Sequence, residues 1–214
     1  LQVSLSVNGK RPAHPWSKGG LQPGDQLLLS RPLGTGVLFA AAMAGAAQPE
    51  DLDHALAQMG TSQHPIVQQL KKLISLEAEA LPSCTDVTGF GLLGHLGEML
   101  QASSQSLQVV LDGSAIPALP GALKLLKANH SSSLAPANRR AWSLLDPSQE
   151  QPAKVILARA DSGFDPEDHK ALLELLVDPQ TCGPLLLGCS EAMADALLQA
   201  NDTAWHRIGV VSAS

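Results

Sequence analysis

The chain has few aromatic residues and no long apolar run. Its 214 residues include no tyrosine, three phenylalanines and three tryptophans, so the apolar side chains are mainly leucine and alanine. Hydrophobic residues still make up 44% of the sequence, which is typical of a globular protein built from helices and aliphatic strands. No apolar run approaches the ~20 residues that a helix needs to cross a bilayer. We therefore expect no membrane segment.

Cysteine and basic clusters are also scarce. Cys84, Cys182 and Cys189 form an odd set without a C-x-x-C pair, which predicts neither a zinc site nor a disulfide framework and favours a reducing, cytoplasmic compartment. The net charge is -6 and no basic cluster is longer than Arg139-Arg140, so a nucleic-acid surface is not predicted. The chain starts without methionine, inside an alternating pattern and without a signal peptide, so we expect a fragment.

The apolar periodicity predicts alternating strands and helices. Residues 1–8 alternate strictly and predict a half-buried strand that ends at a turn, Asn8-Gly9. Further strands are expected at 26–30, 107–111, 155–158, 185–189 and 204–211, and helices at 34–43, 50–59, 62–74, 91–100, 119–128, 166–177 and 191–200. Residues 129–152, rich in Ser, Pro, Asn and Gln, predict a long loop. The pattern alone allows α/β or α+β, and the short connections favour α+β, with a mixed sheet covered by helices.

The strongest chemical signal is the segment 83–95, Ser-Cys-Thr-Asp-Val-Thr-Gly-Phe-Gly-Leu-Leu-Gly-His. A brief extended lead-in at 80–82 precedes it and a helix follows from Gly91, so we expect Asp86 in the turn before a helix, where anions are favoured. Gly89 and Gly91 permit close approach of a backbone or a phosphate. Asp86 is therefore a candidate Mg²⁺ ligand, and its alternative role as a helix cap is about equally supported by the local pattern.

Several neighbours of Asp86 are secondary candidates. Thr85 and Thr88 flank the carboxylate and are placed to orient it or to hold metal-bound water. Cys84 is favoured as a buried small residue over a nucleophile, because the carboxylate raises the pKa of its thiol and no base is near in sequence. His95 is geometrically possible as a second ligand, but an exposed or core-capping histidine is favoured.

Three other segments carry a functional and a structural reading. Gly34-Thr35-Gly36 is typical of a phosphate cradle or, as favoured here, of a tight strand-to-helix turn. In 178–181, Asp-Pro-Gln-Thr, a structural turn is favoured over a phosphate contact because Pro184 lacks a backbone donor. Asn138-Arg139-Arg140 predicts either contact with an anionic substrate or, as favoured, a solvated loop.

Four sequence blocks resemble the selenophosphate synthetases (selenide, water dikinases) and follow one another in the order that this family has. They are the Cys84–His95 motif and the stretches 21–36, 116–123 followed by Asn138, and 177–187. The likeness extends from about Lys18 to Val211. The chain departs from the family at Cys182-Gly183-Pro184, where Ser-Gly-Gly is usual, and at Gln63, where relatives commonly carry Asn.

The resemblance implies a fold and a domain division. These enzymes share a superfamily with aminoimidazole ribonucleotide synthetase, whose C-terminal domain is a mixed β-sheet covered by helices, an α+β fold. Residues 18–214 would form this C-terminal domain. Residues 1–17 would be the end strand of a missing N-terminal domain and its linker.

The resemblance also implies an activity. The family makes selenophosphate, AMP and phosphate from selenide and ATP, as a dimer that uses Mg²⁺. Asp86 matches the one metal-binding aspartate of the C-terminal domain, while ATP is held mainly by the N-terminal domain. The catalytic residues lie upstream, so none is expected in this chain and the fragment alone should be inactive. The alternatives are another ATP-dependent member of the superfamily, such as a thiamine-monophosphate kinase, and a non-catalytic interaction module with the same fold.

Overall fold

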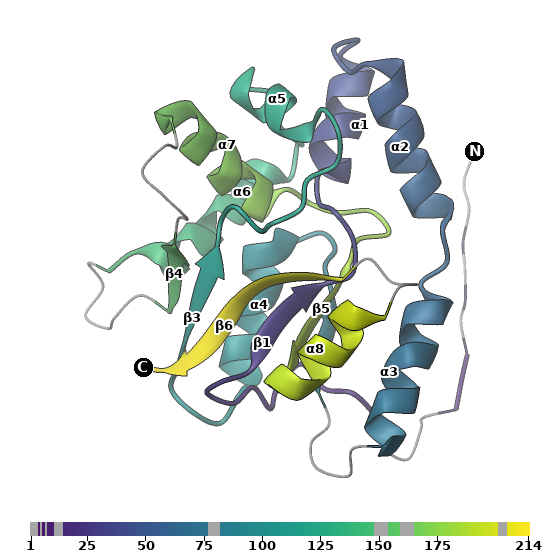
Figure 1. The fold of residues 1–214 in the computed structure, drawn as a ribbon. Coiled ribbons are helices and arrows are strands. Elements are labelled where there is room, and N and C mark those ends of the chain that lie inside the picture. The colour runs from purple at the N-terminus through teal and green to yellow at the C-terminus, as the bar shows by residue number, and fades with distance from the viewer. Residues whose placement is uncertain are drawn as a thin grey trace.

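The computed structural model describes residues 4, 6, 8–10, 15–76, 82–147, 154–158, 165–200 and 205–214. Their strands form one sheet of six, in the order β2-β5-β1-β6-β3-β4 (Figure 1). Only β3 and β4 pair in parallel, and the other neighbouring pairs are antiparallel. The strands are β1 (Gln26–Leu29), β2 (Ser83–Asp86), β3 (Leu107–Asp112), β4 (Val155–Ala158), β5 (Leu185–Cys189) and β6 (His206–Ala213).

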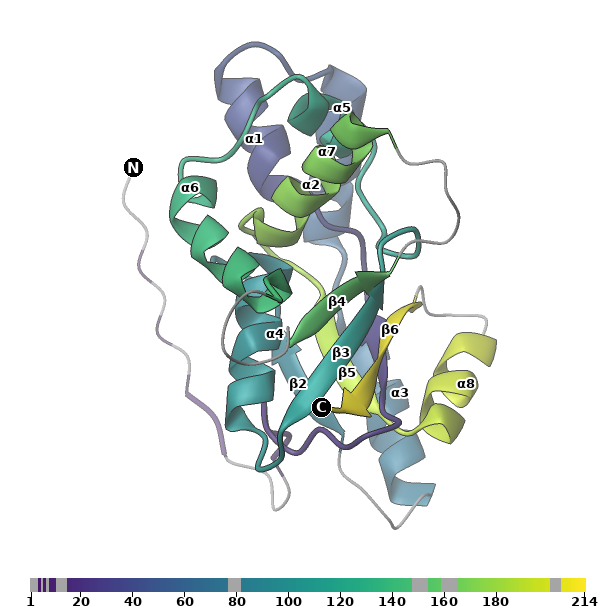
Figure 2. The same ribbon diagram turned by 90° about the vertical axis from the view of Figure 1, so that its left-hand side faces the viewer.

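Helices cover both faces and one end of this sheet. Figure 2 shows α4 on one side of the strands and α8 on the other, while α1, α2, α5 and α7 gather beyond the strand ends in Figure 1. The helices are α1 (Thr35–Met43), α2 (Pro49–Gly60), α3 (His64–Leu76), α4 (Gly91–Ala102), α5 (Ala122–Lys127), α6 (Ala135–Asn138), α7 (Pro166–Val177) and α8 (Glu191–Gln199), with a 3-10 helix η1 (Arg139–Leu145) after α6.

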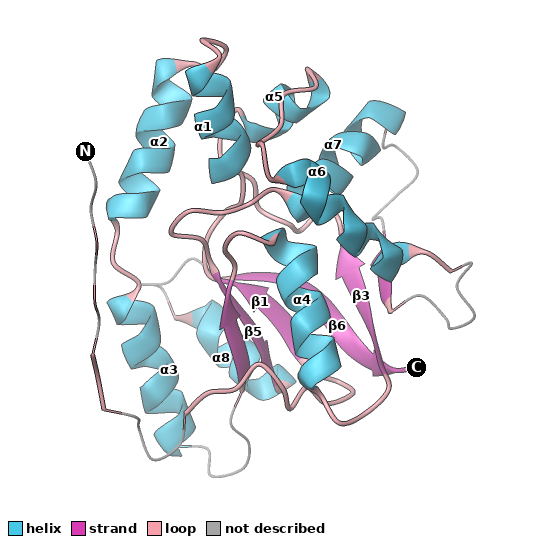
Figure 3. Ribbon diagram, turned by 180° about the vertical axis from the view of Figure 1, so that it is seen from behind, coloured by secondary structure: helices cyan, strands magenta, loops and turns pink. Residues whose placement is uncertain are grey.

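The alternation of side chains along the strands divides the core in two. Leu27 and Leu29 of β1 belong to the larger cluster, which includes the apolar side chains of α4 and α7, whereas Leu28 belongs to the smaller one, with residues of α3 and α8. Figure 3 shows α4 in front of the sheet and α8 behind it. Strands β1 and β5 are therefore buried on both faces, which explains their nearly continuous runs of leucine, whereas β3 alternates buried and half-buried side chains.

The expected fold class is confirmed. The strands predicted at 155–158 and 185–189 and the helix at 166–177 have the bounds that the structure gives. Other bounds shift by a few residues: the helix expected from 119 begins at Ala122, because Gly121 lies before it with a left-handed φ of 78°. The predicted strand at 1–8 falls largely outside the described residues. Within those residues, no helix is long and apolar enough to span a membrane.

Two sequence-based expectations are wrong. Residues 135–145 are helical as α6 and η1 rather than part of a loop, because their apolar side chains, Trp142 and Leu144 among them, pack against the larger core. Of the lead-in expected at 80–82, residues 80 and 81 lie outside the described residues. Strand β2 runs from Ser83 to Asp86, so Asp86 ends a strand instead of occupying a turn at a helix start.

Candidate functional site

Asp86 ends an edge strand with its side chain exposed. It pairs with Leu185 of β5 through the backbone, and its carboxylate has no hydrogen bond or ion pair with any residue that the structure describes. Helix α4 begins only at Gly91, and Phe90 occupies its N-cap position. The helix-cap interpretation of Asp86 is therefore wrong, and the carboxylate is left uncommitted within the described structure.

The loop that follows, Val87–Phe90, is fixed from several directions. The Val87 N–H donates to the Pro184 carbonyl at 2.8 Å, and the Gln180 N–H donates to the Thr88 carbonyl at 2.9 Å. Gly183 packs so closely that a Cβ there would lie 1.9 Å from the Val87 oxygen. The loop 178–184, called the scaffold loop below, therefore holds Val87–Phe90, which is called the Asp86 loop.

Asn138 clamps the same loop to α7. Its buried side-chain amide donates to the carbonyls of Gly89 and Val177, at 2.8 and 3.0 Å. The solvated-loop interpretation favoured from the sequence is therefore wrong for Asn138, and contact of this segment with an anionic substrate stays a prediction. The next residue, Arg139, forms an ion pair with Glu174.

His95 caps the core, as favoured from the sequence. Its ring is buried and lies between the Thr88 hydroxyl, 3.2 Å from Nε2, and Glu98, 3.0 Å from Nδ1. Lys18 donates to the same Glu98 oxygen at 2.6 Å, and this bond holds the pKa of Glu98 below its usual value. The described residues contain no cluster of three or more His, Cys, Asp or Glu side chains placed to hold a metal.

The two threonines beside Asp86 use their hydroxyls elsewhere. Thr88 is hydrogen-bonded to His95, and the Thr85 hydroxyl contacts the Asp86 backbone carbonyl at 3.3 Å. Neither bonds to the Asp86 carboxylate among the contacts of the described chain. No direct contact in the described chain therefore supports the prediction that Thr85 and Thr88 orient the Asp86 carboxylate.

Protein groups already occupy the start of α1. The side-chain oxygen of Gln180 accepts from the N–H groups of Gly34 and Thr35, and Asp178 accepts from the Gly36 N–H at 3.1 Å. The preferred structural interpretations of Gly34–Gly36 and of 178–181 are thus confirmed. Burial is the main cause that raises the pKa of Asp178, to about 7.

Cys84 lacks the character of a nucleophile. Burial, with a smaller contribution from the Asp86 charge, raises the pKa of its thiol to about 12. The preferred reading of a buried small residue fits this half-buried position on β2. Cys182, in contrast, is exposed in a left-handed conformation with φ of 51°.

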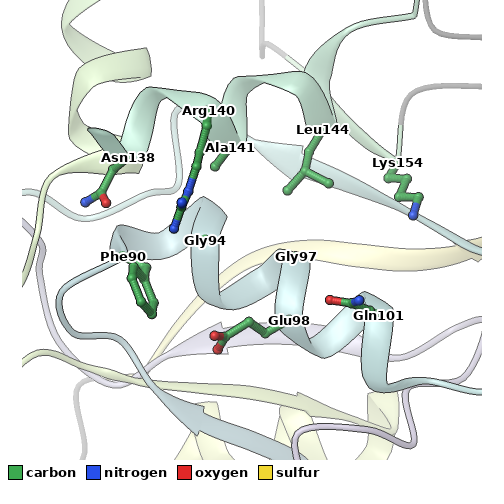
Figure 4. Close-up of a pocket in the computed structure, with 10 residues that line it drawn as sticks. All are labelled: Phe90, Gly94, Gly97, Glu98, Gln101, Asn138, Arg140, Ala141, Leu144 and Lys154. Carbon is green, nitrogen blue, oxygen red and sulfur yellow. The ribbon is translucent and has the colours of Figure 1, made fainter. Parts of the chain in front are cut away.

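A cleft of about 420 Å³ lies between α4 and η1 (Figure 4). Arg140 lines it, with its guanidinium 5.8 Å from the centre of the Phe90 ring. Lys154 lines the other end and Ala141 and Leu144 part of its wall. Asp86 is not among its lining residues, so the cleft and the candidate metal ligand are separate features.

Sequence reasoning missed the polar residues that position the Asp86 loop. Gln180 lies in the segment 178–181 that the sequence singled out, but its contact with the Thr88 carbonyl was not predicted; Glu98 has only its spacing, three residues after His95 on a helix, to indicate a contact. Gln63, where the sequence departs from the family, accepts a hydrogen bond from Ser30 and donates one to the Gly183 carbonyl. It therefore helps to hold the scaffold loop.

Comparisons with known proteins agree with this picture. The family described as "AIR synthase related protein, C-terminal domain" matches residues 22–214. The selenide, water dikinase of Nitratidesulfovibrio vulgaris (strain DP4) is 33% identical over 219 residues, which cover 99% of this chain and 55% of that protein. The chain spans about half the length of the curated relatives that it matches. The resemblance to selenophosphate synthetases is thereby confirmed.

Solved structures show the same fold at low identity. E. coli HypE, a hydrogenase maturation protein, superposes with a TM-score of 0.53 and 17% identity over 94% of this chain and 47% of that one. Thiamine monophosphate kinase from Aquifex aeolicus superposes with a TM-score of 0.51 and 13% identity, over 92% of this chain and 50% of that one. Since the match to the family covers nearly all of the described fold, the chain belongs to the AIR synthase related proteins, as their C-terminal domain.

Proposed function

We propose that this chain is the C-terminal half of a selenide, water dikinase, which makes selenophosphate, AMP and phosphate from selenide and ATP. Within it, Asp86 supplies one ligand to Mg²⁺. The observation that carries the proposal is the exposed carboxylate of Asp86, without a protein partner among the described residues, at the end of β2 in the Cys84–His95 motif. Relatives that match nearly the whole chain are named selenide, water dikinase.

The residues present fit a hard divalent cation. Mg²⁺ is usually bound by one or two carboxylates together with phosphate oxygens and water, so a single uncommitted carboxylate is a suitable contribution from one domain. When bound, Mg²⁺ neutralises charge on the phosphates of ATP. The chain's own part is to hold Asp86 in place, and the contacts of Val87, Thr88 and Gly89 with their neighbours support that role.

The remaining machinery belongs to the rest of the polypeptide. We assign no catalytic residue to this chain and place the nucleotide mainly on an N-terminal domain, which is its first partner. The full protein is proposed to be a homodimer. The proposed cytoplasmic location rests on the small number of cysteines, and no disulfide joins Cys84, Cys182 and Cys189 in the described structure.

The test uses a full-length polypeptide carrying this domain and measures AMP formed from ATP with and without selenide. The wild type should need selenide, and Asp86→Asn should lower activity and raise the Mg²⁺ concentration required. Cys182→Ser, at an exposed site outside the proposed metal site, is the matched control and should behave as wild type. The 214-residue chain alone should form no AMP.

The outcomes separate the competing functions. ATP turnover that is indifferent to selenide would favour another enzyme of the superfamily, such as a thiamine-monophosphate kinase. No turnover by the full-length protein under any of these conditions would favour an interaction module. Selenide-dependent activity that survives Asp86→Asn at an unchanged Mg²⁺ requirement would remove Asp86 from the metal site.

A further inference from the structure

A continuous series of polar contacts joins the Asp86 loop to the surface of α4. His95 is only 5% exposed, and both of its ring nitrogens have partners. Nε2 lies 3.2 Å from the Thr88 hydroxyl, and Nδ1 lies 3.0 Å from Glu98 Oε2. Lys18 Nζ donates to that same carboxylate oxygen at 2.6 Å. A buried imidazole thus connects a loop residue to an ion pair at the surface.

The chemistry of Glu98 sets the direction of these hydrogen bonds. Its bond from Lys18 favours the ionised carboxylate, which can only accept. His95 Nδ1 must then carry a hydrogen, and in the neutral ring Nε2 is an acceptor. Nε2 shares its hydrogen bond with the Thr88 hydroxyl at 3.2 Å, and this bond fixes the side chain of Thr88 against α4.

The position of Thr88 makes this bond relevant to Asp86. The two residues are separated by Val87 alone, and the backbone of the loop is already tied to the scaffold loop by the Gln180 N–H. The hydroxyl–imidazole bond ties the same loop to the helix that follows it. With both attachments in place, the carboxylate projects from a segment held on two sides.

We propose that Thr88, His95 and Glu98 are positioning residues that hold the Asp86 loop in its metal-binding conformation. The proposal rests on the proposed function of Asp86. It assigns no proton transfer to the imidazole, which acts through Thr88 by offering one donor and one acceptor in fixed directions. The loop is thereby preorganised, so that less ordering is needed when the cation binds.

Lys18 extends the series to the segment that enters the domain. The Ser17 carbonyl accepts from the Cys84 N–H at 2.8 Å, and the Ser83 hydroxyl donates to the Gly19 carbonyl at 3.1 Å. Residues 17–19 therefore run along β2 and also supply the cation that pairs with Glu98. The positioning series depends on this segment being in place.

The first test is spectroscopic and does not require activity. In the 214-residue chain with ¹⁵N-labelled histidine, the His95 signals, assigned by their loss in His95→Gln, should show a hydrogen on Nδ1, which faces Glu98. Thr88→Val should shift the Nε2 resonance by removing its partner, while Thr88→Ser should leave it near the wild-type value. An Nδ1 without a hydrogen, or an Nε2 resonance that Thr88→Val leaves in place, would overturn the proposal.

The second test measures the Mg²⁺ dependence of ATP turnover in a full-length polypeptide carrying the domain. Thr88→Val keeps the shape of the side chain but loses the hydroxyl, and should raise the Mg²⁺ concentration for half-maximal rate about fivefold, the equilibrium factor of one hydrogen bond. kcat at saturating Mg²⁺ should change less than this. Thr88→Ser should restore the wild-type requirement.

A second pair of variants keeps the test decisive if Thr88→Val does not fold. The side-chain amide of glutamine can both donate and accept hydrogen bonds, so His95→Gln should come closer to the wild-type Mg²⁺ requirement than His95→Leu. Equal requirements for the two would refute the positioning role. Asp86→Asn is measured in parallel. If it has no effect on the Mg²⁺ requirement, Asp86 is not a metal ligand and the proposed function fails. If Asp86→Asn has an effect and Thr88→Val has none, only the positioning role of Thr88, His95 and Glu98 is refuted.

Discussion

The first residue of α4 offers a stringent test of how the Asp86 loop is built. Gly91 has φ of 70°, a conformation that costs a residue with a Cβ about 1–2 kcal/mol. A Cβ at this position would also lie 2.7–2.9 Å from three backbone atoms of Val177, at the end of α7. Backbone atoms cannot move aside as a flexible side chain can, and overpacking of this kind costs about 1–3 kcal/mol.

We therefore expect Gly91→Ala to lower the free energy of unfolding of the 214-residue chain by about 2–5 kcal/mol, the sum of these two terms. Urea unfolding followed by tryptophan fluorescence measures this difference. Gly89→Ala is the matched control, because a Cβ there meets no atom within 4 Å, and it should stay within about 0.5 kcal/mol of wild type. Equal stability of the two variants would refute the close packing of α4 on α7.

Three further predictions concern buried polar groups. Asn138→Ala should destabilise the chain by about 2 kcal/mol in the same assay, because the buried Val177 carbonyl and the partly buried Gly89 carbonyl lose their donor. Asn138→Asp should cost more by adding a buried acceptor. Burial raises the pKa of Asp178 from 3.8 to about 7, so between these pH values the native state keeps a proton that the unfolded chain loses. The free energy of unfolding should therefore fall as the pH rises from about 4 to about 7, and Asp178→Asn should reduce this fall. Parallel pH profiles of the wild type and Asp178→Asn would contradict this. In the native chain at pH 8, iodoacetamide should modify the exposed Cys182 and spare Cys84, because burial raises the pKa of the Cys84 thiol to about 12. Peptide mapping of the products measures the modification of each cysteine. Faster modification of Cys84 than of Cys182 would contradict the burial of Cys84.

Much of the fold could be predicted because strands and helices follow the apolar pattern closely. The strand at Leu185–Cys189 and the helix at Pro166–Val177 are bounded by residues with clear local preferences: a proline starts the helix, and Ser190 caps α8 directly after the strand. The helical segment at 135–145 could not be predicted, since its composition is that of a loop. Its stability comes from packing against the larger core, which no local pattern contains.

The candidate site was predicted less completely. Asp86 stood out because its motif is distinctive, but the sequence could not show whether its carboxylate would be used as a cap. Whether Asp86 caps the helix depends on where the helix begins. Helix α4 begins at Gly91, where the backbone packs closely against Val177, and its N-cap position is Phe90. The contacts of Gln180 and Asn138 could not be predicted for a different reason, although both residues lie in segments that the sequence singled out. Gln180 and Asn138 act on backbone groups far away in sequence, so their roles arise only from the tertiary fold.

The contacts at the start of α1 bear on how this domain would contribute to the proposed ATP-dependent function. The start of a helix is a common anion site, because its free N–H groups point at the ligand. Here Asp178 and Gln180 already satisfy those groups, so the Gly34–Gly36 turn has no donors to offer a phosphate. A contribution from this domain to phosphate binding then requires another kind of contact. An exposed carboxylate repels phosphate directly but attracts the cation that accompanies it, which supports assigning Asp86 to Mg²⁺ rather than to the nucleotide.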